Sequence, residues 1–75
     1  MNHDRYHVNI FYSDEDRGFI ADVPDLAHCS AFGLTREAAL AEVSIAIKNW
    51  LAAARKLRRP IPKALYRPAV PQISR

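Results

Sequence analysis

One uninterrupted stretch, Arg36 to Leu57, limits the fold most strongly, because it has the pattern of a single long amphipathic helix. Thr35 is a good N-cap for it, and Glu37 places a carboxylate near the positive end of the helix. Apolar residues recur at steps of three and four along one face. They are Ala39, Val43, Ala46, Ile47, Trp50, Ala54 and Leu57, with Leu40 and Leu51 at the flank. Ile45 is an outlier that points to the opposite, polar side.

Three short apolar runs precede this helix and predict strands. Residues 6–13 alternate between apolar and polar side chains, which is the period of a half-buried strand. A polar turn follows, with Gly18 available for a positive backbone angle, and Phe19 to Val23 then predicts the second strand of an antiparallel hairpin. Cys29 to Phe32, bounded by Gly33, predicts a third strand.

These elements predict an α+β fold: a three-stranded antiparallel sheet with one long helix packed on one face. The C-terminal part is available for a fourth, edge strand. We expect four helix residues, Ala39, Val43, Ile47 and Trp50, to pack on Tyr6, Val8, Ile10 and Tyr12 or on their neighbours in the second strand. The uncovered face of the sheet is then expected to carry His7, Asn9, Phe11, Ile20 and Asp22.

The small size of the chain predicts self-association. A chain of 75 residues buries only about 60% of the surface that its unfolded form exposes. A single cysteine excludes a disulfide within the chain, so an oligomer is the expected supplement to the core. The candidates for the oligomer interface are Phe11, Ile20 and Ile45.

The sequence also bears on location. One cysteine suits a reducing compartment, and the first residues lack the apolar core of a signal peptide. Glu42, Lys48 and Asn49 interrupt the long apolar region, so it does not predict a membrane span. We therefore expect a cytoplasmic protein without a membrane partner.

The net charge of +3 hides a strong polarity along the chain. Residues 1–42 hold all eight acids and three bases, a balance of −5, whereas residues 43–75 hold eight bases and no acid, a balance of +8. Two ends of opposite charge are expected to meet different partners. The alternative is that both charged regions are merely solvated or attract each other within an oligomer.

The basic region could hold phosphates, and its candidate nucleic-acid-binding residues are Arg55, Lys56, Arg58, Arg59 and Lys63. Cations near a helix C-terminus also stabilise the helix dipole, which is a sufficient explanation for those nearest the helix end. Apart from Tyr66, no aromatic residue interleaves with these bases. Recognition of single strands therefore has little support from the sequence.

Two groups of residues could suggest catalysis or metal binding. Asp22, Asp25 and Glu37 could form an acidic cluster for nucleic-acid hydrolysis, but each has a local explanation in a strand, a turn or a helix start. His28 and Cys29 are adjacent donors, whereas structural zinc requires four donors at defined spacings. We predict no catalytic, metal or cofactor site.

Several short motifs, in this order and spacing, resemble the HicB-like antitoxins over residues 6–62. They are Tyr6-x-Val8-x-Ile10, Gly18-Phe19-Ile20-Ala21, Pro24-Asp25-Leu26 followed by Cys29, Gly33-x-Thr35-x-x-Ala38, and Pro60-Ile61-Pro62. The resemblance implies a truncated ribonuclease-H-like fold that lacks the catalytic residues of that enzyme. It also implies a HicB-like domain at residues 1–62, which leaves a basic, proline-containing C-terminal arm at residues 63–75.

The chain departs from the family pattern in three places. Ala27 and His28 replace a Pro-Gly pair in the family turn, and Arg58 replaces a common glycine after the helix. The residues after Pro62 are too few for the DNA-binding domain that many members carry. Whether such a member represses its own operon is therefore left open, and so is a solitary or specialised member.

The resemblance implies a non-enzymatic antitoxin that neutralises a small basic mRNA-cleaving toxin of the HicA type. Because such a toxin must present positive charge to RNA, carboxylates are expected to face it. The candidate toxin-binding residues are Asp14, Glu15, Asp16, Asp22 and Asp25. The alternatives are a homo-oligomeric regulatory or nucleic-acid-binding module without a toxin, and a hydrolase.

Overall fold

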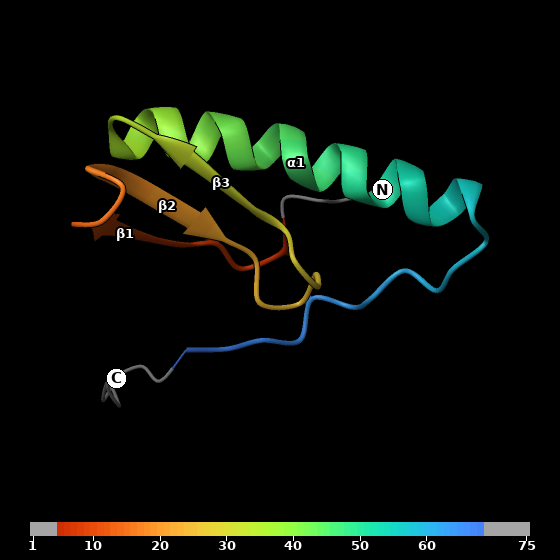
Figure 1. The fold of residues 1–75 in the computed structure, drawn as a ribbon. Coiled ribbons are helices and arrows are strands. Elements are labelled where there is room, and N and C mark those ends of the chain that lie inside the picture. The colour runs from red at the N-terminus through yellow and green to blue at the C-terminus, as the bar shows by residue number, and fades with distance from the viewer. Residues whose placement is uncertain (1–4, 69–75) are drawn as a thin grey trace, which may run out of the picture.

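The computed structural model describes residues 5–68 and contains three strands and one helix. The elements are β1 (Asn9–Ser13), β2 (Gly18–Asp22), β3 (Ser30–Gly33) and α1 (Arg36–Lys56). The strands form one antiparallel sheet in the order β1-β2-β3, and α1 lies along one face of it (Figure 1). This confirms the predicted α+β fold.

The β1–β2 hairpin has its register fixed from Asn9 opposite Asp22 to Ser13 opposite Gly18. The positive backbone angle expected at Gly18 is instead at Arg17, whose φ is 55°. Glycine suits the close approach of β3 at this position, because a Cβ atom on Gly18 would meet the ring tip of Phe32 and lie 2.9 Å from the backbone oxygen of Gly33. The turn is closed by Ser13, whose Oγ donates to the Asp16 carboxylate at 2.8 Å.

The helix begins as the sequence predicts. The Oγ1 of Thr35 accepts a hydrogen bond from the backbone N–H of Ala38 at 3.0 Å. At the other end of the helix, Arg58 has a φ of 56°. The backbone N–H of Arg59 donates to the carbonyl of Ala54 at 2.8 Å, and the backbone N–H of Arg58 donates to the carbonyl of Arg55 at 3.0 Å. This pattern is a Schellman cap with arginine where glycine is usual.

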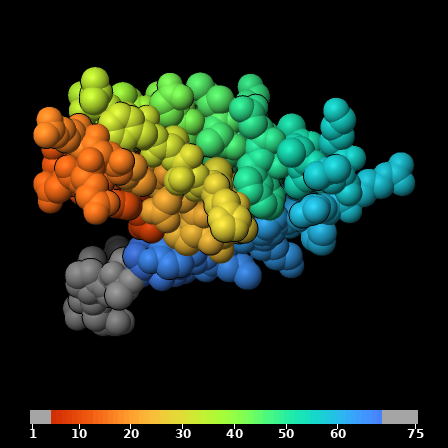
Figure 2. Space-filling model, in the orientation of Figure 1, coloured from red at the N-terminus to blue at the C-terminus, as the bar shows by residue number. Residues whose placement is uncertain are grey.

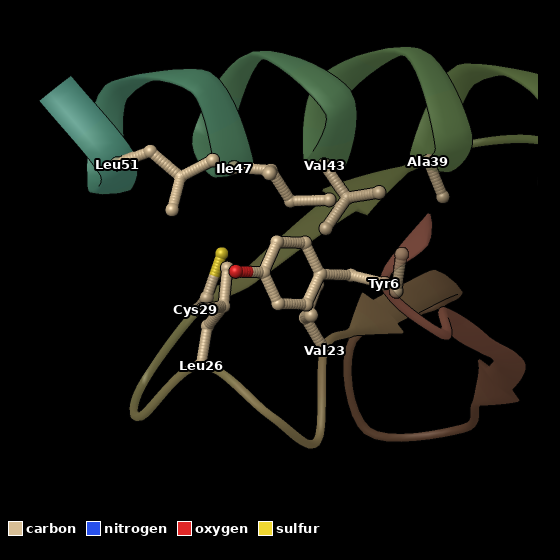
Figure 3. Packing of buried hydrophobic residues seen from close by; sticks show 9 residues of the cluster. Tyr6, Val23, Leu26, Cys29, Ala39, Val43, Ile47 and Leu51 are labelled. Atoms are coloured by element: carbon tan, nitrogen blue, oxygen red, sulfur yellow. The ribbon is translucent and has the colours of Figure 1, made fainter. Parts of the chain in front are cut away.

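The core lies between α1 and a layer made by the sheet and the segments at its edge. Figure 3 shows the helix side chains directed at this layer. The buried cluster consists of Tyr6, Ala21, Val23, Leu26, Cys29, Ala39, Val43, Ile47 and Leu51. Most of the predicted apolar stripe is therefore confirmed, but Leu57 is 63% exposed and Leu40, at the flank, is 47% exposed, so neither belongs to the core. Leu57 is the C-cap residue, where the helical path ends.

Two further expectations need correction. β1 begins at Asn9 rather than at Tyr6, although Tyr6 is buried in the core as expected. Tyr12, predicted to lie under the helix, is 53% exposed and packs edge-on against Phe19, with ring centroids 5.3 Å apart. Trp50 is only half-buried, packs at the edge of the core and donates its indole N–H to the carbonyl of Ala27 at 2.9 Å.

After the helix, the segment from Pro60 to Pro68 runs back in an extended form below the β2–β3 connection (Figure 1). It pairs with none of the strands, so the sheet has no fourth strand within residues 5–68. Ile61 and Ala64 pack against the core, so packing continues past residue 62. The segment is docked rather than free.

Three contacts hold this segment in place. The hydroxyl of Tyr6 donates to the carbonyl of Pro62. The backbone N–H of Tyr66 donates to the two carboxylate oxygens of Asp25 at 3.2 and 3.1 Å. The rings of His7 and Tyr66 lie 4.9 Å apart. Burial, and secondarily the negative charge of Asp25, raises the pKa of Tyr6 above its ordinary value.

Gly33 is predicted to be essential for stability. A Cβ atom there would lie 2.6 Å from the carbonyl carbon of Ala38 and 2.8 Å from the Cα of Ala39, and backbone atoms cannot give way cheaply. We expect Gly33→Ala to lower the free energy of unfolding by about 1 to 3 kcal/mol, the range for overpacking. Urea denaturation measures the change. Ser30→Ala, at an exposed position of the same strand, should change it by less than about 0.5 kcal/mol.

Tyr6→Phe is predicted to weaken the attachment of the docked segment. It is also predicted to make the free energy of unfolding less sensitive to alkaline pH. Loss of the bond to Pro62 should cost about 1 kcal/mol at neutral pH. The folded state holds the phenolic proton of Tyr6 more tightly than the unfolded state does. The resulting contribution to stability is therefore complete below a pH of about 10 and is lost as the pH rises through the raised pKa of the folded state. Urea denaturation over this range should show less alkaline loss in Tyr6→Phe than in the original chain. An equal loss would contradict the assignment, and Tyr12→Phe, at an exposed position, is the control.

Candidate functional site

The acidic candidates fall into two groups. Asp14, Glu15 and Asp16 are exposed together in the turn between β1 and β2. Asp22 is at the other end of that hairpin, Asp25 lies just beyond it, and both are half-buried. The structure therefore does not gather the five predicted toxin-binding acids at one point.

Asp25 and Asp22 have different surroundings. Asp25 accepts the backbone N–H of Tyr66, so its carboxylate already holds the docked segment. Asp22 is the last residue of β2 and pairs with Asn9 on one side and Ser30 on the other. By the alternation of the strand it shares a face with Ile20, on the side of the sheet opposite the helix.

This outer face of the sheet carries an apolar row across all three strands. Phe11 is directly opposite Ile20 in the hairpin, and Ile20 is opposite Phe32 on β3. Phe11 is 50% exposed, Phe32 is 41% exposed, and Ile20 is half-buried. We call Phe11, Ile20 and Phe32 the outer row. It lies between the acidic turn at one end and Asp22 at the other.

The three predicted interface residues do not share a surface. Phe11 and Ile20 belong to the outer row, whereas Ile45 is on α1, which covers the other face, and is 54% exposed. One closed interface between two copies cannot contain all three. Phe32 is not among the predicted interface residues, although its place in a short apolar run indicates a strand residue that could be exposed on this face.

The basic candidates gather at the far end of the helix. Arg55 and Lys56 occupy its last turn, Arg58 and Arg59 follow it, and Lys63 lies further along the chain. All five are exposed. Figure 2 shows this end of the molecule at the opposite side from the hairpin turn. The charge polarity of the sequence therefore becomes a separation in space.

An apolar hollow lies beside these bases and has a volume of about 270 Å³. Its lining comes from the last turns of α1, the β2–β3 connection and the segment after the helix. The lining residues are Ala27, His28, Trp50, Ala53, Ala54, Leu57 and Arg59. The sequence assigned Trp50 and Leu57 to the core stripe and did not predict this hollow. The sequence does contain one sign of the hollow: the apolar stripe of the helix continues beyond the length that the short strands can cover.

Cys29 and His28 do not form a reactive pair. Cys29 is buried in the core, and burial raises the pKa of its thiol, which disfavours the nucleophilic thiolate. His28 is exposed and has a φ of 61°. Within residues 5–68 no three His, Cys, Asp or Glu side chains are grouped as a metal site would require. His3 lies outside the described residues.

Comparisons with known protein families, with characterised proteins and with solved structures give no match. In the described part of the chain, no helix is long and apolar enough to cross a membrane. Two surfaces therefore stand as candidate sites on their own geometry: the outer row with its acids, and the basic hollow.

Proposed function

We propose that this protein is a non-enzymatic HicB-like antitoxin that binds and neutralises a small basic mRNA-cleaving toxin in the cytoplasm. The observation that carries the proposal is the outer row, a partly exposed apolar strip bordered by the exposed carboxylates of the turn at one end and by half-buried Asp22 at the other. A surface of this kind suits a partner that is both basic and partly apolar.

The two parts of this surface have different tasks. The acids of the turn attract the positive surface with which a toxin holds RNA, and this speeds encounter. The outer row supplies affinity, because each large apolar side chain contributes about 1.5 to 3 kcal/mol when fully buried. Since Asp25 is engaged by Tyr66, the contacts fall to Asp14, Glu15, Asp16 and Asp22.

The backbone gives further support to the resemblance. His28 and Arg58 stand where the family pattern has glycine, and their φ angles are 61° and 56°. This left-handed region is the one that glycine adopts at little cost. Both angles are therefore compatible with the glycines of the family pattern and support the proposal.

The second candidate function is a homo-oligomeric regulatory module without a toxin partner. The observation that favours it is the amount of apolar surface left exposed, on the outer row and at Ile45. Two outer rows facing each other would also bring their acids close together, which disfavours that pairing. We therefore assign self-association to the helix surface around Ile45.

The first test is a charge reversal in the turn. Asp14→Lys with Glu15→Lys leaves the Ser13–Asp16 contact intact and should slow association with a small basic toxin of the HicA type by about tenfold at low salt. The effect should shrink as the salt concentration rises. Stopped-flow fluorescence or surface plasmon resonance measures the rate.

The control is Ala41→Lys with Glu42→Lys, which changes the net charge by three units instead of four at exposed positions of α1 beyond its first turn. It should slow association far less. Equal slowing by both pairs would mean that only net charge matters, and no slowing by the turn variant would contradict the proposal.

The second test separates toxin binding from self-association. Sedimentation at micromolar concentration is expected to show at least a dimer. Ile45→Lys should give monomers that still bind the toxin, whereas Ile20→Lys should weaken toxin binding and leave the oligomer intact. A compact monomer in the original chain would remove the self-association argument. If Ile45→Lys weakens toxin binding and Ile20→Lys gives monomers instead, the two surfaces have been assigned the wrong way round.

A further inference from the structure

The hollow at the end of α1 is built before any ligand arrives. The indole N–H of Trp50 donates to the carbonyl of Ala27 at 2.9 Å, which fixes the ring against the β2–β3 connection. The Schellman cap turns the chain so that Arg59 also lines the hollow. Leu57 stays 63% exposed at its border, so apolar surface is left in contact with water.

Two strained residues flank this hollow. Within the described residues, three non-glycine residues have a positive φ: Arg17, His28 and Arg58. His28 lines the hollow directly, and Arg58 precedes Arg59, which also lines it. Left-handed backbone is unfavourable for such side chains, and strain of this kind gathers at functional sites. Here the two residues with a positive φ, His28 and Arg58, place an imidazole and a guanidinium at the same end of the molecule.

We propose that this hollow receives one unstacked base of a single-stranded nucleic acid, while the surrounding arginines and lysines hold the phosphates. The hollow has a volume of about 270 Å³, slightly less than the range of about 300 to 1,000 Å³ that is usual for drug-sized ligands, so it has room for one small planar group such as a base. An aromatic surface among cations is also the chemistry by which proteins hold single strands without strict sequence preference.

The charges around the hollow favour phosphate. Arg55, Lys56, Arg58, Arg59 and Lys63 are exposed, and no acid follows Glu42 in the sequence. Asp25 is in the same connection as His28, but its carboxylate accepts the backbone N–H of Tyr66. The carbonyls of Ala53, Ala54 and Arg55 accept the backbone N–H groups of residues 57–59, so these carbonyls do not require the basic side chains as hydrogen-bond donors.

This site is separate from the proposed toxin surface. The hairpin turn and the end of α1 lie at opposite ends of the molecule (Figure 1). Binding of nucleic acid at the hollow does not depend on the antitoxin proposal, and the two can fail independently.

Trp50 is the only tryptophan in the chain, so its fluorescence reports on the hollow alone. Titration of the full chain with a short oligouridine should quench this fluorescence to saturation. An abasic oligomer of equal length and charge should bind more weakly and leave the fluorescence unchanged. If the abasic oligomer binds as tightly, phosphate contacts alone explain binding and the base site is overturned. Tighter binding of polyglutamate would assign the hollow to an acidic protein segment instead, and would also overturn it.

A matched pair of variants tests the position of the base. Ala53 lines the hollow and is exposed, while Ala52 is exposed on the same turn of α1 but does not line it. Ala53→Glu should weaken oligouridine binding by about tenfold or more, the size of one lost stacking contact. Ala52→Glu makes the same charge change and should weaken it much less. Equal losses would overturn the proposal.

A second pair tests the strained arginine. Arg58→Gly and Arg17→Gly remove the same charge and relieve the same backbone conformation at opposite ends of the molecule. Both should raise the melting temperature. Only Arg58→Gly should weaken oligouridine binding, by several-fold. If it stabilises the chain and leaves binding unchanged, Arg58 is not part of the site and the proposed role of the strain is wrong.

Discussion

The structure depends on a geometric constraint: one helix can cover only one face of a sheet. The buried residues of α1 are spaced along a single stripe, Ala39, Val43, Ile47, Leu51 and Ala54, and that stripe meets the inner face. Nothing in residues 5–68 provides a second helix for the outer face. The helix therefore leaves the outer row uncovered as a direct result of the fold class, with Phe11 and Phe32 exposed and Ile20 half-buried, and our proposal of a macromolecular partner rests on this row.

The constraint also acts along the helix, because α1 is longer than the sheet beneath it. Its last turns rest instead on the β2–β3 connection, where Leu26 is almost fully buried and the N–H groups of Val23, Leu26 and Cys29 are bonded within the connection. The segment from Pro60 to Pro68 then closes the layer from below. The core is thus completed by irregular segments, and the hollow lies where they stop covering the helix.

The sequence predicted the elements, their order and the phase of the helix, because the periods of two and of three to four residues are local properties. It placed Tyr6, Val43 and Ile47 in the core correctly. It was wrong about Tyr12 and Leu57, because burial at the edge of a sheet or at the end of a helix depends on how far the partner element extends. It also offered Gly18 for an angle that Arg17 adopts, because the close approach of β3 to Gly18, which a Cβ atom would obstruct, is a tertiary contact that a turn pattern does not reveal.

The candidate sites were predictable only as charge, not as shape. The sequence separated acids from bases, and the fold turns this into two ends because the hairpin turn lies by the start of α1 and the bases by its end. It could not show that Trp50, His28 and Arg59 meet, since they come from three different segments. Nor could it show that His28 and Arg58 carry backbone strain. Glycine at either position would relieve that strain and also remove the side chain from the basic end, so stability and binding make opposite demands on the same residues.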